Sequence, residues 1–253
     1  MGQIKIVNNC RTLLRAYQNG LLGQTRMPED SNPGFSDNQL EERLFYFTLP
    51  MALNYQRDSY KLWQSALASY QDPAIKSIFS VKNSVIISEE SLRRKLMKHK
   101  LALQPQKHIT TWGTIARSIY QNWGSLVNLF YSIDDDFLKL KNLIQVDFKK
   151  DFPYLSGPKI FNYWSFVMIN YGRVKMRNKH FIDIAPDTHI TKCSIKLGVI
   201  TQEEAQAFSK EQISQRWREA LQNSGIDPID MHSPLWFWSR NGFLYSLPKI
   251  IKD

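Results

Sequence analysis

The segment Asp151-Phe-Pro-Tyr-Leu-Ser-Gly-Pro-Lys159 combines two prolines and a glycine directly before an apolar stretch. These residues cannot sit inside a helix, so we predict a compact turn over residues 151–158. Pro158 suits the first position of a helix, and the apolar residues that follow predict a buried helix over residues 160–171. That stretch is too short to cross a membrane, which takes about 20 residues. This tight turn before a buried helix is the sharpest local feature of the sequence.

Helical periodicity extends to both sides of the turn. Apolar residues recur with i, i+3, i+4 spacing and alternating patterns are scarce, so we predict an all-α fold. Ser36 and Gln39 make a capping-box signature, and Thr201 opens a second one, from which we expect a helix through Trp217. Pro50 is expected to start or kink a new helix. Further helices are expected over residues 88–103, 110–122 and 134–149.

The composition is that of a folded, basic protein. Of the 253 residues, 43% are hydrophobic and 22% are charged, which are ordinary globular values and exclude wholesale disorder. There are 33 lysine and arginine residues against 23 aspartate and glutamate residues, a formal net charge of +10. The basic excess is concentrated in residues 93–107 and 159–196. A polyanion is therefore the expected partner.

The number of cysteines and the N-terminal residues limit which cellular compartment and which metal sites we expect. Only Cys10 and Cys193 are present, too few for an iron–sulfur cluster or a four-cysteine zinc site. The first ten residues, MGQIKIVNNC, lack the apolar core of a signal peptide, and Ile6 stands where a myristoylation signal has Ser or Thr. We expect a reducing compartment and no metal centre.

Lys159 is the first candidate for chemistry. It lies in the first turn of the predicted helix, where the helix dipole and apolar neighbours such as Phe161 and Trp164 disfavour a charged ammonium. A lysine in such a place is a candidate nucleophile. The turn around Ser156 and Gly157 offers free backbone N–H groups for a phosphate oxygen. The alternative interpretation is a surface lysine beside an ordinary helix start.

Asp187 is the second candidate. It precedes a predicted helix that Gly198 closes, so it is placed to be the N-cap of that helix. Capping is the commoner role, and the alternative is a carboxylate that takes a proton or stabilises a cation. A metal site is a further interpretation, but the spacing of its candidate ligands matches no metal motif. Those candidates are His180, Asp183, Asp187 and His189.

Two motifs together carry a resemblance to a known family. Leu155-Ser-Gly-Pro-Lys159 and Ala185-Pro-Asp-Thr-His-Ile190, followed by Lys196-Leu-Gly198, resemble the helix-hairpin-helix DNA glycosylase superfamily, which includes endonuclease III and the 8-oxoguanine glycosylases. In that family a catalytic lysine follows a Gly-x-Gly-type hairpin, and an Asp-Thr-His segment holds an essential aspartate. Tyr55-Gln-Arg-Asp-Ser59 resembles the segment whose amide fills the gap left by the extruded nucleotide. The resemblance spans residues 40–200.

The sequence departs from the family pattern in three respects. Leu155 occupies the position of the first hairpin glycine. The interval from Lys159 to Asp187 is longer than in endonuclease III and nearer to that of the archaeal 8-oxoguanine glycosylases, and residues 171–179 are expected to fill it. The cysteines that bind iron and sulfur in endonuclease III are absent from the sequence. None of these departures removes a catalytic group.

The resemblance implies a two-lobed helix-hairpin-helix fold with a central cleft for DNA. A barrel-like bundle over residues 36–170 would end in the hairpin, and residues 1–35 and 171–253 would form the second lobe. The implied activity is that of a base-excision repair DNA glycosylase with AP-lyase activity, and the expected base is 8-oxoguanine. Lys159 would attack the sugar C1′, and Asp187 would stabilise the cationic sugar or help to deprotonate the amine. DNA contacts are expected from Gln56, Ser156, Gly157, Lys107 and His189.

Other functions remain open at this point. A monofunctional glycosylase would use Asp187 to activate water, and a non-catalytic DNA-binding protein is favoured by Leu155. A metal-dependent hydrolase is the most distant alternative. We expect a monomer whose partner is double-stranded DNA with a damaged base, with no cofactor, no metal and no membrane association. The expected location is the cytoplasm at the nucleoid, or the nucleus in a eukaryote. Candidates for lining the base pocket are Trp63, Trp112, Trp164, Trp236 and Trp238.

Overall fold

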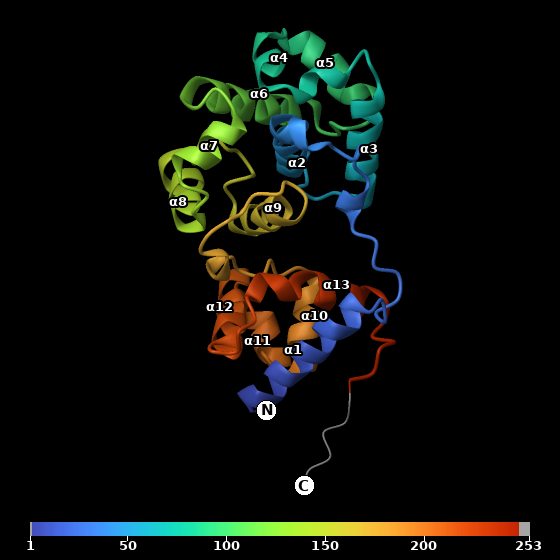
Figure 1. Cartoon of the computed structure of the whole chain (residues 1–253). Coiled ribbons are helices and arrows are strands. Elements are labelled where there is room, and N and C mark those ends of the chain that lie inside the picture. The colour runs from blue at the N-terminus through green and yellow to red at the C-terminus, as the bar shows by residue number, and fades with distance from the viewer. Residues whose placement is uncertain (1, 248–253) are drawn as a thin grey trace. The chain divides into compact units, whose positions relative to one another are not determined.

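The computed structural model describes residues 2–247. Its elements there are helices, and the one strand-like feature in this range is a single bridge between Asp136 and Arg177. The predicted all-α class is therefore confirmed. The chain divides into two compact units, which are described separately below with the labels of Figure 1. Unit 1 comprises Met1–Arg26 and Lys179–Asp253, and unit 2 comprises Met27–Asn178.

Both chain ends contribute to unit 1, which is the form of division that the resemblance implies. The boundaries lie at 26/27 and 178/179 instead of 35/36 and 170/171. Aromatic packing explains the difference. Phe35 and Tyr171 both pack against Phe47, at ring-centroid distances of 6.1 and 5.5 Å, so the segments on either side of the predicted bundle belong to its core.

Unit 2 is a bundle built around the buried helix α2. Its α-helices are α2 Leu40–Ala52, α3 Ser59–Gln71, α4 Val81–Ile86, α5 Glu89–Lys98, α6 Pro105–Asn122, α7 Leu126–Ser132, α8 Phe137–Asn142 and α9 Pro158–Asn170. Short 3-10 turns are η1 Pro28–Asp30, η2 Asp37–Gln39 and η3 Lys76–Phe79, and η4 Leu143–Asp147 is a π-helix. Residues 43–52 of α2 are all buried, and this helix contacts α3, α6, α7 and α9.

Tryptophans fill the core of unit 2. Trp63, Trp112 and Trp164 are each 0% exposed. Burying an indole N–H requires an acceptor, and Trp164 donates to Thr48 Oγ1 at 3.0 Å. The predicted helix over residues 160–171 is confirmed as α9, which begins directly after the 151–157 turn and carries Trp164 on its buried face.

Several predicted helix boundaries in unit 2 are wrong. The helix expected over residues 110–122 is α6, which already begins at Pro105. The one expected over residues 134–149 is α8, which ends at Asn142 and is followed by the π-helix η4.

Pro50 starts no helix but lies inside α2, which ends two residues later. A proline in the last turn of a helix removes little of its hydrogen bonding. The next helix, α3, begins after Asp58, whose side chain caps it by accepting the Lys61 N–H at 3.0 Å. The helix expected over residues 88–103 ends at Lys98 because Lys100 adopts a left-handed backbone, with φ 58°.

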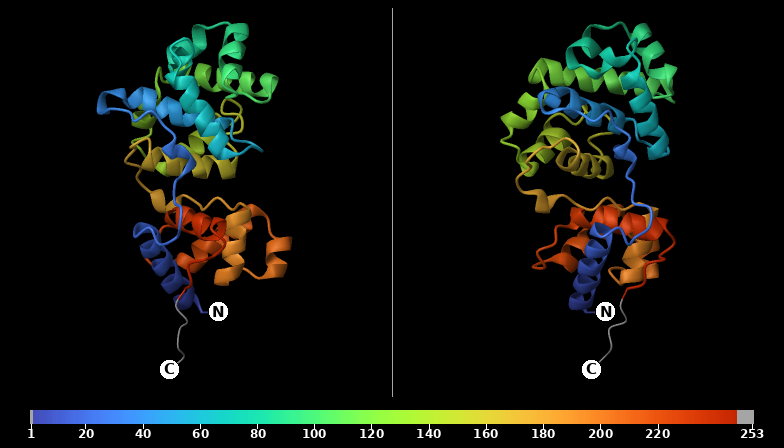
Figure 2. Two further views of the ribbon diagram at one scale, coloured as in Figure 1. Left: turned by 90° about the vertical axis from the view of Figure 1, so that its right-hand side faces the viewer. Right: turned by 45° about the vertical axis from the view of Figure 1, so that its right-hand side comes forward.

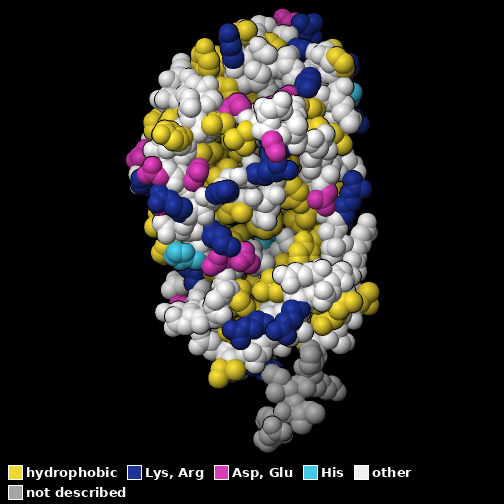
Figure 3. Space-filling model, viewed as in Figure 1, with side chains coloured by type: hydrophobic (Ala, Val, Ile, Leu, Met, Phe, Trp, Pro, Cys, Tyr) yellow, Lys and Arg dark blue, Asp and Glu magenta, His cyan; other side chains and the backbone are white. Residues whose placement is uncertain are grey.

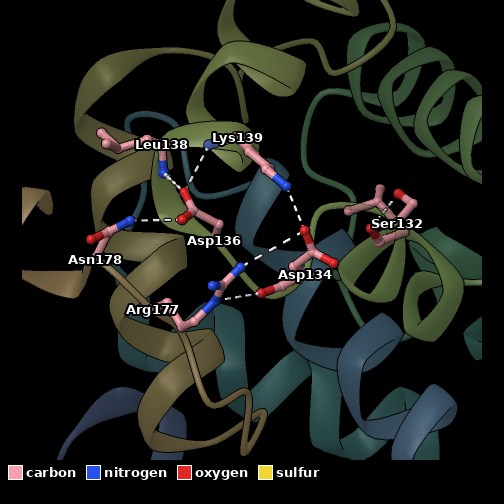
Figure 4. Close-up of polar contacts among 8 residues, drawn as sticks. Ser132, Asp134, Asp136, Leu138, Lys139, Arg177 and Asn178 are labelled. Carbon is pink, nitrogen blue, oxygen red and sulfur yellow. Dashed lines mark hydrogen bonds and ion pairs between the residues drawn. The ribbon is translucent and has the colours of Figure 1, made fainter.

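The segment after α9 is fixed to the start of α8 (Figure 4). The Asp136 carboxylate caps α8 by accepting the N–H of Leu138 at 2.9 Å and also accepts the Asn178 amide at 2.6 Å. The Arg177 guanidinium donates to the Asp134 carbonyl at 3.0 Å. These contacts hold residues 177 and 178 of the predicted extra chain within unit 2, whereas Lys179 already belongs to unit 1.

Unit 1 is a smaller helical bundle. It consists of α1 Gln3–Gln18, η5 Lys179–Phe181, α10 Thr188–Leu197, α11 Gln202–Ala207, α12 Lys210–Leu221, η6 Pro228–Met231 and α13 His232–Arg240. Helix α13 contacts α1 and α10, and both views of Figure 2 show the blue α1 beside the red C-terminal helices. None of the helices within residues 2–247 is both long and apolar enough to cross a membrane.

The helix predicted from Thr201 through Trp217 is two helices. Thr201 and Glu204 form the predicted capping box, but α11 ends at Ala207. Ser209 then forms a second capping box with Gln212, which starts α12. The second box satisfies the first N–H groups of a new helix, so the chain breaks there.

Candidate nucleic-acid interface and catalytic residues

Lys159 lies in the first turn of α9 and is exposed. Gly157 is the N-cap and Pro158 the first residue of this helix, as the sequence predicts. The predicted apolar surroundings are wrong, because Phe161 and Trp164 are 0% exposed and belong to the core. Positions two and five residues further along a helix are turned by about 200° and 140°, so these rings lie on a different face from the amine.

The turn before α9 uses its own backbone donors. The Ser156 N–H donates to the Phe152 carbonyl at 2.9 Å, and the Gly157 N–H donates to the Tyr154 carbonyl at 3.1 Å. The prediction of free N–H groups at these two residues is therefore wrong, since closing so tight a turn consumes them. Within residues 2–247, the N–H groups of Lys159 and Ile160 find no acceptor. These two donors at the start of α9 remain available to an anion.

Close packing inside this turn depends on Gly157. A Cβ atom there would lie 3.2 Å from the Tyr154 carbonyl oxygen, so another residue would force the turn to shift. The Ser156 hydroxyl donates to the Lys149 carbonyl at 3.2 Å, and the Gln145 amide donates to the Ser156 carbonyl at 3.0 Å. Ser156 and Gly157 therefore shape the turn rather than present their own donors to a ligand.

Gln56 lies in the loop of residues 53–58 between α2 and α3. Its side chain is exposed and its backbone is left-handed, with φ 51°. The ring of the preceding Tyr55 packs on that of Tyr154, with centroids 5.4 Å apart. The Gln56 loop thus contacts the turn that leads to Lys159, and both segments belong to unit 2.

A third loop, residues 99–104, joins this group through Arg57. The Arg57 guanidinium donates to the carbonyls of Leu101 at 2.7 Å and Lys100 at 3.2 Å. His108, at the start of α6, is 5% exposed, and its Nδ1 accepts the Leu103 N–H at 3.1 Å. Burial lowers the pKa of His108 to about 4, so it remains a neutral acceptor near pH 7. Three loops are therefore fixed to one another in unit 2.

Exposed lysines lie in the 99–104 loop, directly before the turn of residues 151–157, and at the helix starts that follow these two segments. In the part of the chain that the structure describes, none of them forms an ion pair with a carboxylate. By contrast, Lys98 of α5 pairs with Asp72 at 2.7 Å, and the face in Figure 3 shows acidic and basic side chains intermingled over α7 and α8. The loop lysines therefore carry positive charge that no carboxylate within the described range neutralises. They are Lys100, Lys107, Lys149, Lys150 and Lys159.

Asp187 is the N-cap of α10, as predicted. One carboxylate oxygen accepts the Ile190 N–H at 2.9 Å, and the other accepts the indole N–H of Trp236 from α13 at 3.1 Å. Gly198 closes the helix with φ 74°, which confirms the predicted C-terminus. Asp187 is half-buried, so its carboxylate has a fixed orientation and remains partly accessible.

His189 lies two residues after Asp187, in the first turn of α10. Its Nδ1 is 3.1 Å from the Ser239 hydroxyl, and its ring packs edge-on to Trp236 with centroids 5.5 Å apart. The Arg240 guanidinium lies over the Trp236 ring, 4.8 Å from its centroid. Trp236 therefore contacts Asp187, His189 and Arg240 within unit 1.

The metal interpretation receives no geometric support. Asp183 forms an ion pair with Arg218 at 3.3 Å, and His180 packs against Phe181. Among residues 2–247, no three His, Cys, Asp or Glu side chains are arranged to hold a metal ion. Unit 1 does contain a hollow of about 760 Å³ between η5, α12 and residues 222–228, but neither Asp187 nor His189 lines it.

Four of the five candidate pocket tryptophans are core residues. Trp63, Trp112, Trp164 and Trp238 are at most 2% exposed, whereas Trp236 is partly exposed beside Asp187. Of the five, Trp236 is the one that a ligand can reach in the described structure. Its contact with Asp187 joins residues 49 positions apart, which no local sequence pattern indicates.

Glu29 is a chemically distinctive residue that the sequence does not signal. Its side chain is 0% exposed and accepts the Trp63 indole N–H at 2.8 Å and the Tyr163 hydroxyl at 3.0 Å. Burial raises the pKa of Glu29 to about 7, despite these hydrogen bonds, which favour the ionised form. Tyr163 lies one turn after Lys159 on α9.

Comparison with known proteins found no match: neither a family model nor a curated protein matches this sequence. The assignment of a function therefore rests on the residues of this chain. Lys159 belongs to unit 2 and Asp187 to unit 1, so each candidate is defined by the surroundings within its own unit.

Proposed function

We propose that this protein is a base-excision DNA glycosylase with AP-lyase activity and a helix-hairpin-helix glycosylase fold. Lys159 is the nucleophile and Asp187 is the carboxylate that assists it. The substrate is double-stranded DNA with a damaged base, with 8-oxoguanine as the first base to test.

The observation that carries the proposal is the contact between the Gln56 loop and the turn before Lys159. The rings of Tyr55 and Tyr154 pack together with centroids 5.4 Å apart. This contact links the loop that carries the exposed Gln56 amide to the turn that leads to the exposed Lys159 amine, and the loop lysines belong to the same unit. A DNA-processing site needs positive charge for the phosphates and side chains that replace an extruded base. The two oriented oxygens of Asp187 supply the complementary carboxylate in unit 1.

The reaction can be written with these groups alone. The Nζ lone pair of Lys159 forms a bond to C1′ while the bond from C1′ to the base breaks, and the base leaves with those electrons and takes a proton. The C1′–O4′ bond then breaks as the Nζ lone pair forms a double bond to C1′, O4′ takes a proton, and a Schiff base joins Nζ and C1′. Loss of a C2′ proton then expels the 3′ phosphate by β-elimination. Asp187 accepts the proton of the attacking amine or stabilises the positive charge on the sugar.

Borohydride trapping tests the nucleophile. With an 8-oxoguanine duplex and borohydride, the wild-type protein should give a covalent protein–DNA adduct, and Lys159→Gln should give none. Lys82→Gln, which changes an exposed lysine on α4 of the same unit, is the matched control and should still be trapped. If Lys159→Gln is trapped as well as the wild type, the assigned nucleophile is wrong. A panel of other damaged bases, tested the same way, defines the substrate.

One alternative has its own supporting observation. Leu155 is 0% exposed, and the Ser156 and Gly157 N–H groups are consumed inside the turn, so this turn lacks the open backbone donors of a glycine hairpin. A non-catalytic DNA-binding protein would fit that geometry. It predicts salt-sensitive binding to duplex DNA with no base released from any substrate of the panel. Base release without a trapped adduct would instead favour a monofunctional glycosylase in which Asp187 activates water.

A further inference from the structure

Two tyrosines from different loops form an aromatic pair at the surface of unit 2. Tyr55 is 45% exposed, and its ring lies 5.4 Å from the ring of Tyr154 with an angle of 34° between the planes. Tyr154 is partly exposed. A large aromatic side chain left in water has a π face available to a flat partner.

The backbone fixes both rings before any ligand binds. Tyr154 itself and Gln56, the residue after Tyr55, have left-handed backbones, with φ 62° and 51°. Such conformations cost energy for residues other than glycine and persist only where the surrounding structure imposes them. The hydrogen bonds of Arg57 to Lys100 and Leu101 anchor the first loop. The pair is therefore a preorganised surface rather than two independent mobile side chains.

The charge around the pair points to the kind of ligand. Lys149 and Lys150 directly precede the turn that contains Tyr154, Lys100 lies in the loop that Arg57 holds, and all three are exposed. A flat aromatic surface on segments that carry positive charge fits a nucleobase whose phosphates lie on either side. A base can stack there only if it is not already stacked in a duplex.

We propose that Tyr55 and Tyr154 form a stacking platform for an unpaired nucleobase of the bound DNA. The inference rests on the proposed function, since it takes DNA as the partner of unit 2. It adds a substrate preference: the protein binds DNA that contains a displaced base more tightly than fully paired DNA of the same sequence. Every base has a π face, so the platform tolerates any base at the displaced position.

Equilibrium binding to a bulged duplex tests the platform. The probe is an undamaged duplex with a single bulged 2-aminopurine, compared with the same duplex in which 2-aminopurine is paired. We expect the wild-type protein to bind the bulged duplex roughly tenfold more tightly and to quench 2-aminopurine fluorescence on binding. Tyr55→Ala should remove most of that preference and of the quenching, while Tyr55→Phe should retain both. Tyr131→Ala, which removes an exposed tyrosine of α7, is the control and should behave as the wild type.

The outcome separates this inference from the glycosylase assignment. The probe contains no damaged base, so the result does not depend on Lys159 or Asp187. Equal affinity of the wild-type protein for the two duplexes, or full preference and quenching in Tyr55→Ala, would overturn the platform even if borohydride trapping succeeds. Because Tyr55 is an exposed loop residue, its variants should fold, and the wild-type quenching tests the idea without any variant. A bulge preference that Tyr55→Ala abolishes would support the platform even if trapping fails.

Discussion

Glu29 should make the stability of the protein depend on pH near neutrality. Its pKa is raised to about 7 by burial, above the value near 4.5 of an unfolded chain. A carboxyl group with a raised folded pKa favours folding below pH 4.5, and this contribution is lost as the pH rises through 7. Glu29→Gln cannot ionise, so we expect it to lose less stability between pH 4.5 and 8 than the wild type.

Urea unfolding at several pH values measures this difference. Between pH 4.5 and 8 the free energy of unfolding of the wild type should fall by up to about 3 kcal/mol more than that of Glu29→Gln. This upper bound follows from the difference between the folded and unfolded pKa of Glu29. Glu90→Gln, at an exposed position of α5, is the control and should follow the wild type. Identical pH profiles for the wild type and Glu29→Gln would show that Glu29 has an ordinary pKa in the folded protein.

Asp187 combines a structural and a proposed chemical role, and Asp187→Asn separates them. Asparagine caps a helix about as well as aspartate, but its amide nitrogen cannot accept the Trp236 indole N–H, so the free energy of unfolding should fall by about 1–3 kcal/mol. An amide can neither take a proton nor balance a cationic sugar, so base release should fall at least about 100-fold. Single-turnover release of the damaged base measures this. A variant that folds normally and retains the wild-type rate would leave Asp187 with capping alone.

At the scale of elements, the three loops of unit 2 should set the salt dependence of DNA binding. Each lysine that neutralises a phosphate contributes about 0.9 to the slope of log affinity against log salt. The double variant Lys149→Gln/Lys150→Gln should therefore reduce that slope by up to about 2. Binding titrations with one duplex between low and moderate salt measure the slope. Lys82→Gln, at an exposed site on α4, should leave it unchanged, and an unchanged slope in the double variant would exclude this turn from the DNA contact.

The element scale also shows which parts of the structure a sequence can predict. The capping boxes at Ser36 and Thr201, the N-cap Asp187 and the C-terminal Gly198 are confirmed because each involves neighbours within a few residues. The extent of a helix is less predictable when signals compete, as at Ser209, where a second cap interrupts an amphipathic pattern that continues through it.

Contacts between distant segments could not be predicted from local patterns. Periodicity assigns Trp63 to a helix face, but it does not indicate that Glu29, 34 residues away in sequence, accepts the hydrogen bond of the Trp63 indole N–H. Nor does it indicate that Tyr55 meets Tyr154, because turn residues carry no periodic signal. The candidate residues could thus be named from the sequence, whereas the neighbours that orient them could not.

At the scale of the whole molecule, each unit holds one part of the proposed chemistry. Unit 2 carries the exposed amine of Lys159 with the loop lysines, and unit 1 carries the oriented carboxylate of Asp187 with His189 and Trp236. The central claim of the proposed function is that Lys159 is the nucleophile and that Asp187 is the carboxylate that assists it. It makes Lys159, among all the exposed lysines, the residue that becomes bonded to DNA.

Mass-spectrometric mapping of the borohydride-trapped adduct tests this claim most directly. After digestion of the wild-type adduct, the reduced sugar should be found on the peptide that contains Lys159 and on no other. The Asp187→Asn protein should give far less of the same adduct. A sugar attached to a different lysine, or complete base release with no adduct at all, would contradict the account.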